Sequence, residues 1–149
     1  MRLVLACVAL VIVLGFAGCG GGDEENEASF VEQADVVCSE AEQEISRVPQ
    51  PQDPTDPLQL ANFLERAVPV AKEQNADLKE LERPAEQEAQ INELIAALDA
   101  EVDAAERMLA AAKSQDRQAI QQLLTESGLA SAQAKRAAEG LDMAVCGAS

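Results

Sequence analysis

The chain has 149 residues, of which 48% are hydrophobic but only 2% aromatic, and it contains no histidine, tryptophan or tyrosine. Its 27 acidic and 11 basic side chains give a formal net charge of −16, which argues against binding to nucleic-acid phosphates or anionic lipid headgroups. Without histidine the chain lacks the usual nucleophile–base triads and the Glu-x-x-His motifs of di-iron bundles, so we predict neither an enzyme nor a bound cofactor. A core of small aliphatic side chains favours closely packed helices.

The N-terminus has the pattern of an export signal. After a short basic start, residues 3–14 form an apolar run of about a dozen residues, too short as a helix to cross a hydrocarbon core of about 30 Å. Ala17, Gly18 and Cys19 close this run. They resemble the bacterial lipobox, in which a peptidase cleaves before a cysteine that carries diacylglycerol. The resemblance implies a signal peptide over 1–18, cleavage between Gly18 and Cys19, and lipidation of Cys19.

The predicted anchor has one departure from the lipobox pattern. Phe16 stands where leucine is usual, which would slow cleavage or move the recognised leucine to Leu14. The alternatives are an ordinary secretory signal that contains a cysteine and a retained membrane helix. A diacylglyceryl group supplies two acyl chains, enough for stable anchoring. We therefore expect a lipid-anchored protein on the extracytoplasmic face of the cell membrane, with residues 19–28 as a flexible acidic tether.

The four cysteines separate by position. Cys7 would leave with the signal peptide, and Cys19 would take the lipid. Cys38 and Cys146 remain as an even pair in an oxidising compartment, which predicts a disulfide; two buried free thiols are the alternative. They do not form a C-x-x-C pair, so thiol–disulfide exchange is not expected.

The domain over 29–149 is predicted to contain four helices. The first begins at a capping box, in which Ser29 and Glu32 satisfy each other's backbone N–H groups, and it ends before the proline-rich segment 49–54. Thr55 or Asp56 caps the second, which has proline at its first helical position.

The second helix contains Pro69, which should kink it. The third is expected to start at Pro84 after a tight turn. Asp116 can cap the fourth, and Gly140 is the expected C′ residue at its end.

Apolar positions in all four segments repeat at spacings that alternate between three and four, which predicts the left-handed packing of a bundle. Short connections force antiparallel neighbours, so the fold class is an all-α, up-down-up-down four-helix bundle. In that topology the start of the first helix and the end of the fourth share one end, which agrees with a Cys38–Cys146 disulfide. The fourth helix is lined by small side chains, which predicts close packing rather than an open cavity; the positions are Ser127, Ala130, Ala134 and Ala137.

Two groups of polar residues are candidate binding sites. The third helix is crowded with carboxylates that form either a cation- or partner-binding face or a solvated surface, and we favour the second interpretation. Only Asp103 and Arg107 form a favourable i,i+4 pair there. Asn75 and Asn92 fall near the apolar stripes of their helices, where they line a small polar pocket or fix the register; the second role is favoured.

Three further motifs carry a resemblance across the whole chain. These are a cysteine in the first helix (Val36-Val37-Cys38), a break at residues 81–85 and a C-terminal ending from Gly140 to Cys146. Together with the lipobox and tether, they resemble a broad group of small actinobacterial lipoproteins. The resemblance implies an anchored helical domain and no particular activity.

These sequence features are compatible with two functions. The first expectation is a monomeric module that contacts another envelope protein, which requires a solid core and an apolar surface patch. The alternative is a small-molecule-binding lipoprotein, which requires a cavity inside the bundle with a few convergent polar groups.

Overall fold

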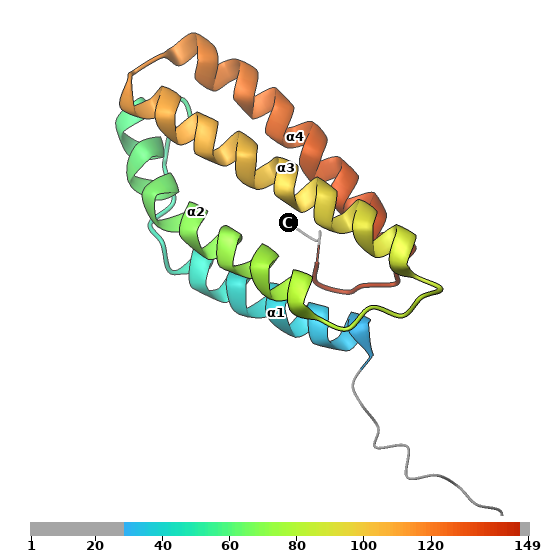
Figure 1. Cartoon of the computed structure of the whole chain (residues 1–149). Helices are drawn as coiled ribbons and strands as arrows, with labels where there is room; N and C mark the ends of the chain where they lie inside the picture. Colours follow the sequence, from blue (N-terminus) through green and yellow to red (C-terminus); the bar gives the residue numbers. More distant parts are fainter. Residues whose placement is uncertain (1–28, 147–149) are drawn as a thin grey trace, which may run out of the picture.

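The computed structural model describes residues 29–146, and this part of the chain consists of helices and connecting turns without a strand. The helices are α1 (Phe30–Ser46), α2 (Pro57–Glu80), α3 (Glu88–Lys113) and α4 (Arg117–Gly140). Successive helices run in opposite directions (Figure 1). The fold is therefore the all-α, up-down-up-down four-helix bundle that the sequence predicted. The predicted signal peptide, the tether and Cys19 lie outside the described residues.

Three of the helices begin where side-chain caps were predicted. The Glu32 N–H donates to Ser29 Oγ over 3.3 Å, and the Ser29 N–H donates to Glu32 Oε2 over 2.8 Å, which completes the capping box. Asp56, rather than Thr55, caps α2 by accepting from two N–H groups of the first turn at 2.9 and 3.1 Å. Asp116 caps α4 at 3.0 Å. Local sequence thus fixes these three starts.

The predicted start of the third helix was wrong. α3 begins at Glu88, four residues after Pro84, and residues 81–87 form the connection. The residue before a proline is disfavoured in the helical region, and the Gln87 N–H donates to the Pro84 carbonyl over 3.0 Å to close a turn. Pro84 therefore belongs to the turn that precedes the helix.

Helices α3 and α4 end in the same hydrogen-bonded motif, although not at glycine. Gln115 after α3 and Asp142 after α4 take left-handed conformations, with φ of 58° and 57°. At the end of α4 the Asp142 N–H donates to the Glu139 carbonyl and the Met143 N–H to the Ala138 carbonyl, the two bonds of a Schellman motif. Gly140, predicted as C′, is instead the last residue of the helix, because these bonds place the left-handed turn two residues later.

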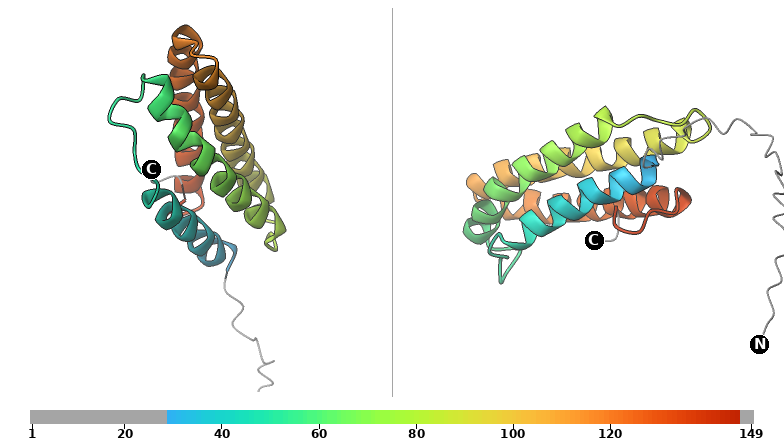
Figure 2. Two further views of the ribbon diagram at one scale, coloured as in Figure 1. Left: turned by 90° about the vertical axis from the view of Figure 1, so that its left-hand side faces the viewer. Right: turned by 90° about the horizontal axis from the view of Figure 1, so that it is seen from below.

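The helices pack unequally. α3 packs along both α2 and α4, while α1 packs mainly against α2 and makes little direct contact with α4 (Figure 2). α1 has 17 residues and α3 has 26. At 1.5 Å per residue these correspond to about 26 and 39 Å, so α1 covers only part of the bundle. Pro69 lies on the exposed side of α2, and the helix continues through it.

The hydrophobic core consequently has two parts. The disulfide-end core contains residues of all four helices and of the segment after α4. The far-end core, near the α3–α4 turn, is built from α2, α3 and α4. The buried members of the first are Phe30, Ala34, Cys38, Leu78, Ile91, Leu94, Ile95, Ala97, Leu98, Ala134, Ala138, Leu141, Met143 and Cys146. Those of the second are Leu60, Ala61, Leu64, Val68, Met108, Ala111, Ala112, Ile120 and Leu123.

The buried stripe of α3 departs in its second half from the seam that the three-and-four spacing predicts, which is Ile91, Ile95, Leu98, Val102, Ala105, Leu109 and Ala112. Val102, Ala105 and Leu109 are only half-buried, whereas Ala104 and Met108 are buried. The stripe therefore moves around α3 as it passes from one core to the other.

Replacing Gln115 by glycine should raise the free energy of unfolding by about 0.5–1 kcal/mol, because glycine takes the left-handed conformation without a clash from Cβ. Denaturant unfolding measures this change. The control Gln122→Gly, at an exposed position inside α4, should instead lower stability by about 0.5–1 kcal/mol. Equal destabilisation by both substitutions would contradict the assignment.

Candidate functional site

Two adjoining cavities lie in the middle of the bundle, between the two cores. Their volumes are about 400 and 330 Å³. We call them together the central groove, because they share five lining residues from three helices: Ile45, Ala71, Gln74, Leu98 and Glu101. The outer cavity is completed by α1, the segment after it, α4 and the C-terminal segment, with Cys38, Glu42, Ser46, Gln50, Ser131, Val145 and Cys146. The inner cavity is completed by Phe63, Leu64, Ala67, Val68, Asn75, Val102, Ala105 and Ser127.

The groove exists because the middle layer of the bundle is built from short or polar side chains. Ala71, Gln74 and Ser127 occupy positions where the two cores carry larger apolar residues. α1 ends at Ser46 and leaves its seam with α4 open at this level. The prediction that α4 packs without a cavity was therefore wrong at Ser127. The polar interruptions Gln74 and Ser127 were the sequence signal for the groove.

The two predicted pocket residues lie in different surroundings. Asn75 is 5% exposed, lines the inner cavity, and its Nδ2 donates to Asp99 Oδ1 over 3.2 Å. Asn92 is exposed, and its Oδ1 accepts from Arg83 Nη1 over 2.9 Å. Asn92 is absent from the lining of the central groove, so the structure does not bring the two asparagines together there.

Glu101 is a groove residue that the sequence pattern did not reveal. Its carboxylate is half-buried in the wall shared by both cavities. Burial raises its pKa, because a carboxylate loses hydration there, and a hydrogen bond with Ser131 of α4 opposes the shift. In the sequence, Glu101 looks like the other surface acids of the third helix. Its position on the helix does not show that a cavity lies opposite its side chain.

The C-terminal segment forms one wall of the groove and is held there covalently. Cys38 and Cys146 form the predicted disulfide, with their Cα atoms 5.3 Å apart. Cys146 and its neighbour Val145 both line the outer cavity. The disulfide links residues 108 positions apart, which contributes about 4–5 kcal/mol to stability in the chain-entropy account.

Asp35 of α1 holds the same segment by hydrogen bonds. Its two carboxylate oxygens accept from the backbone N–H groups of Ala144, Val145 and Cys146 at 2.9, 2.9 and 3.2 Å. Partial burial acts to raise the pKa of Asp35, but the three backbone donors outweigh it, and the pKa lies below its usual value. The charged form of Asp35 is therefore the one that fits the folded chain.

The acidic face of α3 is more fully paired than the sequence predicted. Asp99 pairs with Lys79 over 2.7 Å, and Glu106 pairs with Lys72 over 2.9 Å, both across to α2. Arg107 contacts Glu126 of α4 at 2.6 Å as well as Asp103 at 3.5 Å, the pair that was predicted. Helix-to-helix pairs of this kind depend on tertiary packing, which explains why single-helix spacing did not reveal them.

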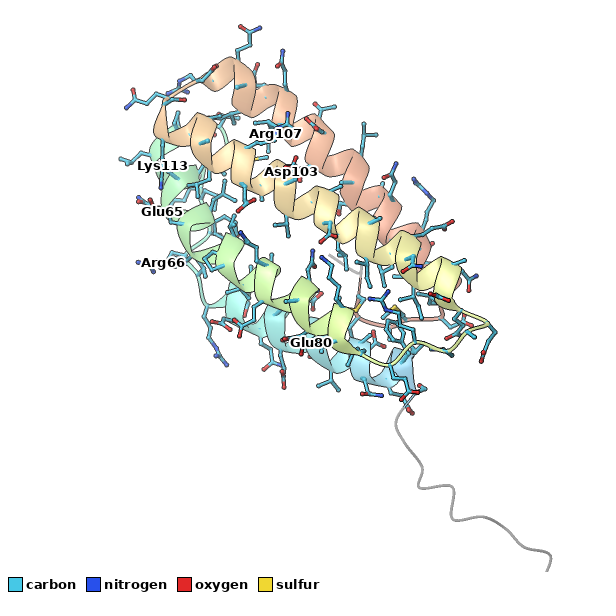
Figure 3. All side chains as sticks on the ribbon, in the orientation of Figure 1. Glu65, Arg66, Glu80, Asp103, Arg107 and Lys113 are labelled. Atoms are coloured by element: carbon cyan, nitrogen blue, oxygen red, sulfur yellow. A yellow bond between two sulfur atoms is a disulfide. The ribbon has the colours of Figure 1, made fainter. Side chains whose placement is uncertain are left out.

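A fifth ion pair closes the far end of the bundle. Lys113 at the end of α3 contacts Glu65 of α2 at 2.9 Å, and Figure 3 labels both residues together with Asp103 and Arg107. All five pairs are largely exposed, so each contributes at most about 1 kcal/mol. Within residues 29–146 there is no cluster of three or more acidic or cysteine side chains placed to hold a metal ion.

Asp35→Asn should lower the free energy of unfolding at neutral pH by about 1–2 kcal/mol, because three hydrogen bonds to a charged acceptor are weakened. A depressed folded-state pKa means that the stabilisation is complete above the unfolded pKa of about 3.9 and is lost as the pH falls through the folded value. The difference between wild type and variant should therefore shrink in acid. Urea unfolding at a series of pH values measures it, with the exposed Glu40→Gln as control. A difference that is constant down to strongly acidic pH would contradict this role.

Among residues 29–146, no helix is both long and apolar enough to span a membrane. In this same part of the chain, the exposed large hydrophobic side chains are single residues on three different helices, namely Val36, Leu58 and Leu129. No family model, no curated protein and no solved structure matches this chain.

Proposed function

We propose that this chain is a lipid-anchored, extracytoplasmic module that binds a small molecule in the central groove. The observation that carries the proposal is the gap between the two cores, lined mainly by apolar side chains with a few amides, hydroxyls and carboxylates. Cavities of about 300–1,000 Å³ with such a lining are typical of small-molecule sites. Larger apolar side chains at Ala71, Gln74 and Ser127 would bury more apolar area, so the short and polar residues of this layer do not maximise stability.

The groove supports binding rather than catalysis. Its lining contains carboxylates, hydroxyls and amides, and the whole sequence lacks histidine, so no imidazole is present to activate a nucleophile. Neither a cofactor nor a metal enters the proposal.

A protein-contact module, the other function expected from the sequence, would have a solid core and an apolar surface patch. The described part of the chain has a divided core, and Val36, Leu58 and Leu129 come from different helices. These observations favour the small-molecule function over the protein-contact function.

The location is proposed from the sequence. Diacylglycerol on Cys19 would hold the mature protein at the outer face of the cytoplasmic membrane, and residues 19–28 would connect the anchor to the domain. The Cys38–Cys146 disulfide is consistent with an oxidising compartment.

Ala71→Leu should abolish binding, because its added side-chain atoms would enter the groove that Ala71 lines from α2. The measurement is native mass spectrometry of the mature protein purified in mild detergent from its own host's membranes. We expect the wild type to retain a small molecule that Ala71→Leu lacks. The melting temperature of the variant should stay the same or rise, because a void is filled. The control Ala76→Leu, at an exposed position of the same helix, should retain the molecule. Recovery of wild type without any small molecule, or equal retention by Ala71→Leu, would contradict the proposal.

The anchor is tested separately by intact mass. The mature wild type should begin at Cys19 and carry the added mass of a diacylglyceryl group. Cys19→Ser should remove this added mass, whereas Cys7→Ser, a change inside the predicted signal peptide, should leave the mature mass unaltered. A mature N-terminus at another residue, or an unmodified Cys19, would overturn the lipid anchor without affecting the groove.

A further inference from the structure

The central groove carries charge of one sign. Its lining includes the carboxylates Glu42 of α1 and Glu101 of α3, and none of the described lysines or arginines lines it. Glu42 is exposed at the rim, whereas Glu101 lies half-buried where the inner and outer cavities meet. A ligand in the groove therefore meets negative charge at its centre.

Glu101 differs from the acids that flank it on α3. Asp99 and Glu106 each pair with a lysine of α2, and Asp103 pairs with Arg107. Glu101 takes part in none of the ion pairs found among residues 29–146; its described partner is the neutral Ser131 hydroxyl. A half-buried carboxylate loses part of its hydration, and without a counter-ion nothing replaces that loss. A cation placed beside Glu101 would replace it by electrostatic attraction.

The surface next to Glu101 is apolar. Leu98, one turn before it on α3, faces the same space as Ile45 of α1 and Val145 of the C-terminal segment. The inner cavity continues this apolar surface with Phe63 and further residues of α2. An inorganic cation would leave the apolar wall of the groove in contact with water. An organic anion would cover this wall but would be repelled by Glu101. A molecule that combines an apolar part with a positive group satisfies both halves of the lining.

We infer that the groove binds a small organic amine, with its ammonium group beside Glu101 and its apolar part against Leu98, Ile45 and Val145. The inference rests on the proposed small-molecule function and adds the chemical class of the ligand. In this arrangement Glu101 provides the counter-ion, Ser131 orients its carboxylate, and the apolar wall supplies affinity in proportion to the area that the ligand buries.

The test compares three probes that share one alkyl chain: hexylammonium, hexanol and hexanoate. Each is titrated calorimetrically into the full mature protein held in zwitterionic nanodiscs, and empty nanodiscs supply the blank. We expect wild type to bind hexylammonium at least about tenfold more tightly than hexanol, a difference of about 1.4 kcal/mol, and to bind hexanoate more weakly than hexanol.

Glu101→Gln should reduce the affinity for hexylammonium about tenfold, to that for hexanol, and should leave hexanol binding unchanged. Glu88→Gln removes the same charge at an exposed position of α3 and should change neither affinity. The melting temperature of Glu101→Gln should equal or exceed that of wild type, because a neutral amide is easier to bury.

Equal binding of hexanol and hexylammonium by wild type would overturn the amine inference even if Glu101→Gln did not fold. An unchanged hexylammonium affinity in folded Glu101→Gln would overturn it as well. Both results leave the small-molecule function standing. Failure of that function has a different signature, in which none of the three probes binds and wild type retains nothing from its own membranes.

Discussion

The position of α1 depends on its attachment to the chain end that follows α4. α1 packs mainly on α2 and makes little direct contact with α4, so its place in the bundle relies on the Cys38–Cys146 disulfide and on Asp35. Asp35 accepts hydrogen bonds from three N–H groups, and all three belong to the segment that includes Cys146. The disulfide and these hydrogen bonds thus hold α1 to the α4 side of the bundle, whereas packing between helices holds the other neighbouring helices together. They also permit the α1–α4 seam to stay open without loss of the fold.

An open seam requires that stability come from the two ends of the bundle. The disulfide-end core uses all four helices, and the far-end core uses α2, α3 and α4 where α1 no longer reaches. The middle layer, with Ala71, Gln74, Glu101 and Ser127, buries less apolar area and holds a carboxylate that is costly to desolvate. These four residues belong to neither core, whereas Leu64, Val68 and Leu98 belong to a core and also line the groove.

Local rules predicted much of the fold because local interactions determine it. The capping box at Ser29, the Asp116 cap and the proline break after α1 act over a few residues, and the oxidising compartment predicted the pairing of Cys38 with Cys146. The rest depends on what faces each residue across the bundle. Glycine preference failed for Gly140 because the bond from the buried Met143 to the buried Ala138 places the left-handed residue at Asp142. Likewise, periodicity shows which positions face inward. It does not show whether a short side chain packs against a neighbour or faces a gap, so the groove could not be predicted in full.

The capping box and the disulfide together also determine how the domain responds to mechanical load. Any pull through the residues before Ser29 enters at the first turn of α1, where the box resists fraying. Beyond Phe30 only about two turns of helix precede Cys38, and there the force passes into a covalent bond and on to Cys146. When the chain is pulled at both ends, extension can therefore peel about two turns of α1 and no more while the disulfide is intact. Ile45, Ala71 and Glu101 lie beyond that point and carry none of this load. Cys38 and Cys146 carry it and also line the groove, so tension at the N-terminal end acts on the C-terminal wall of the groove.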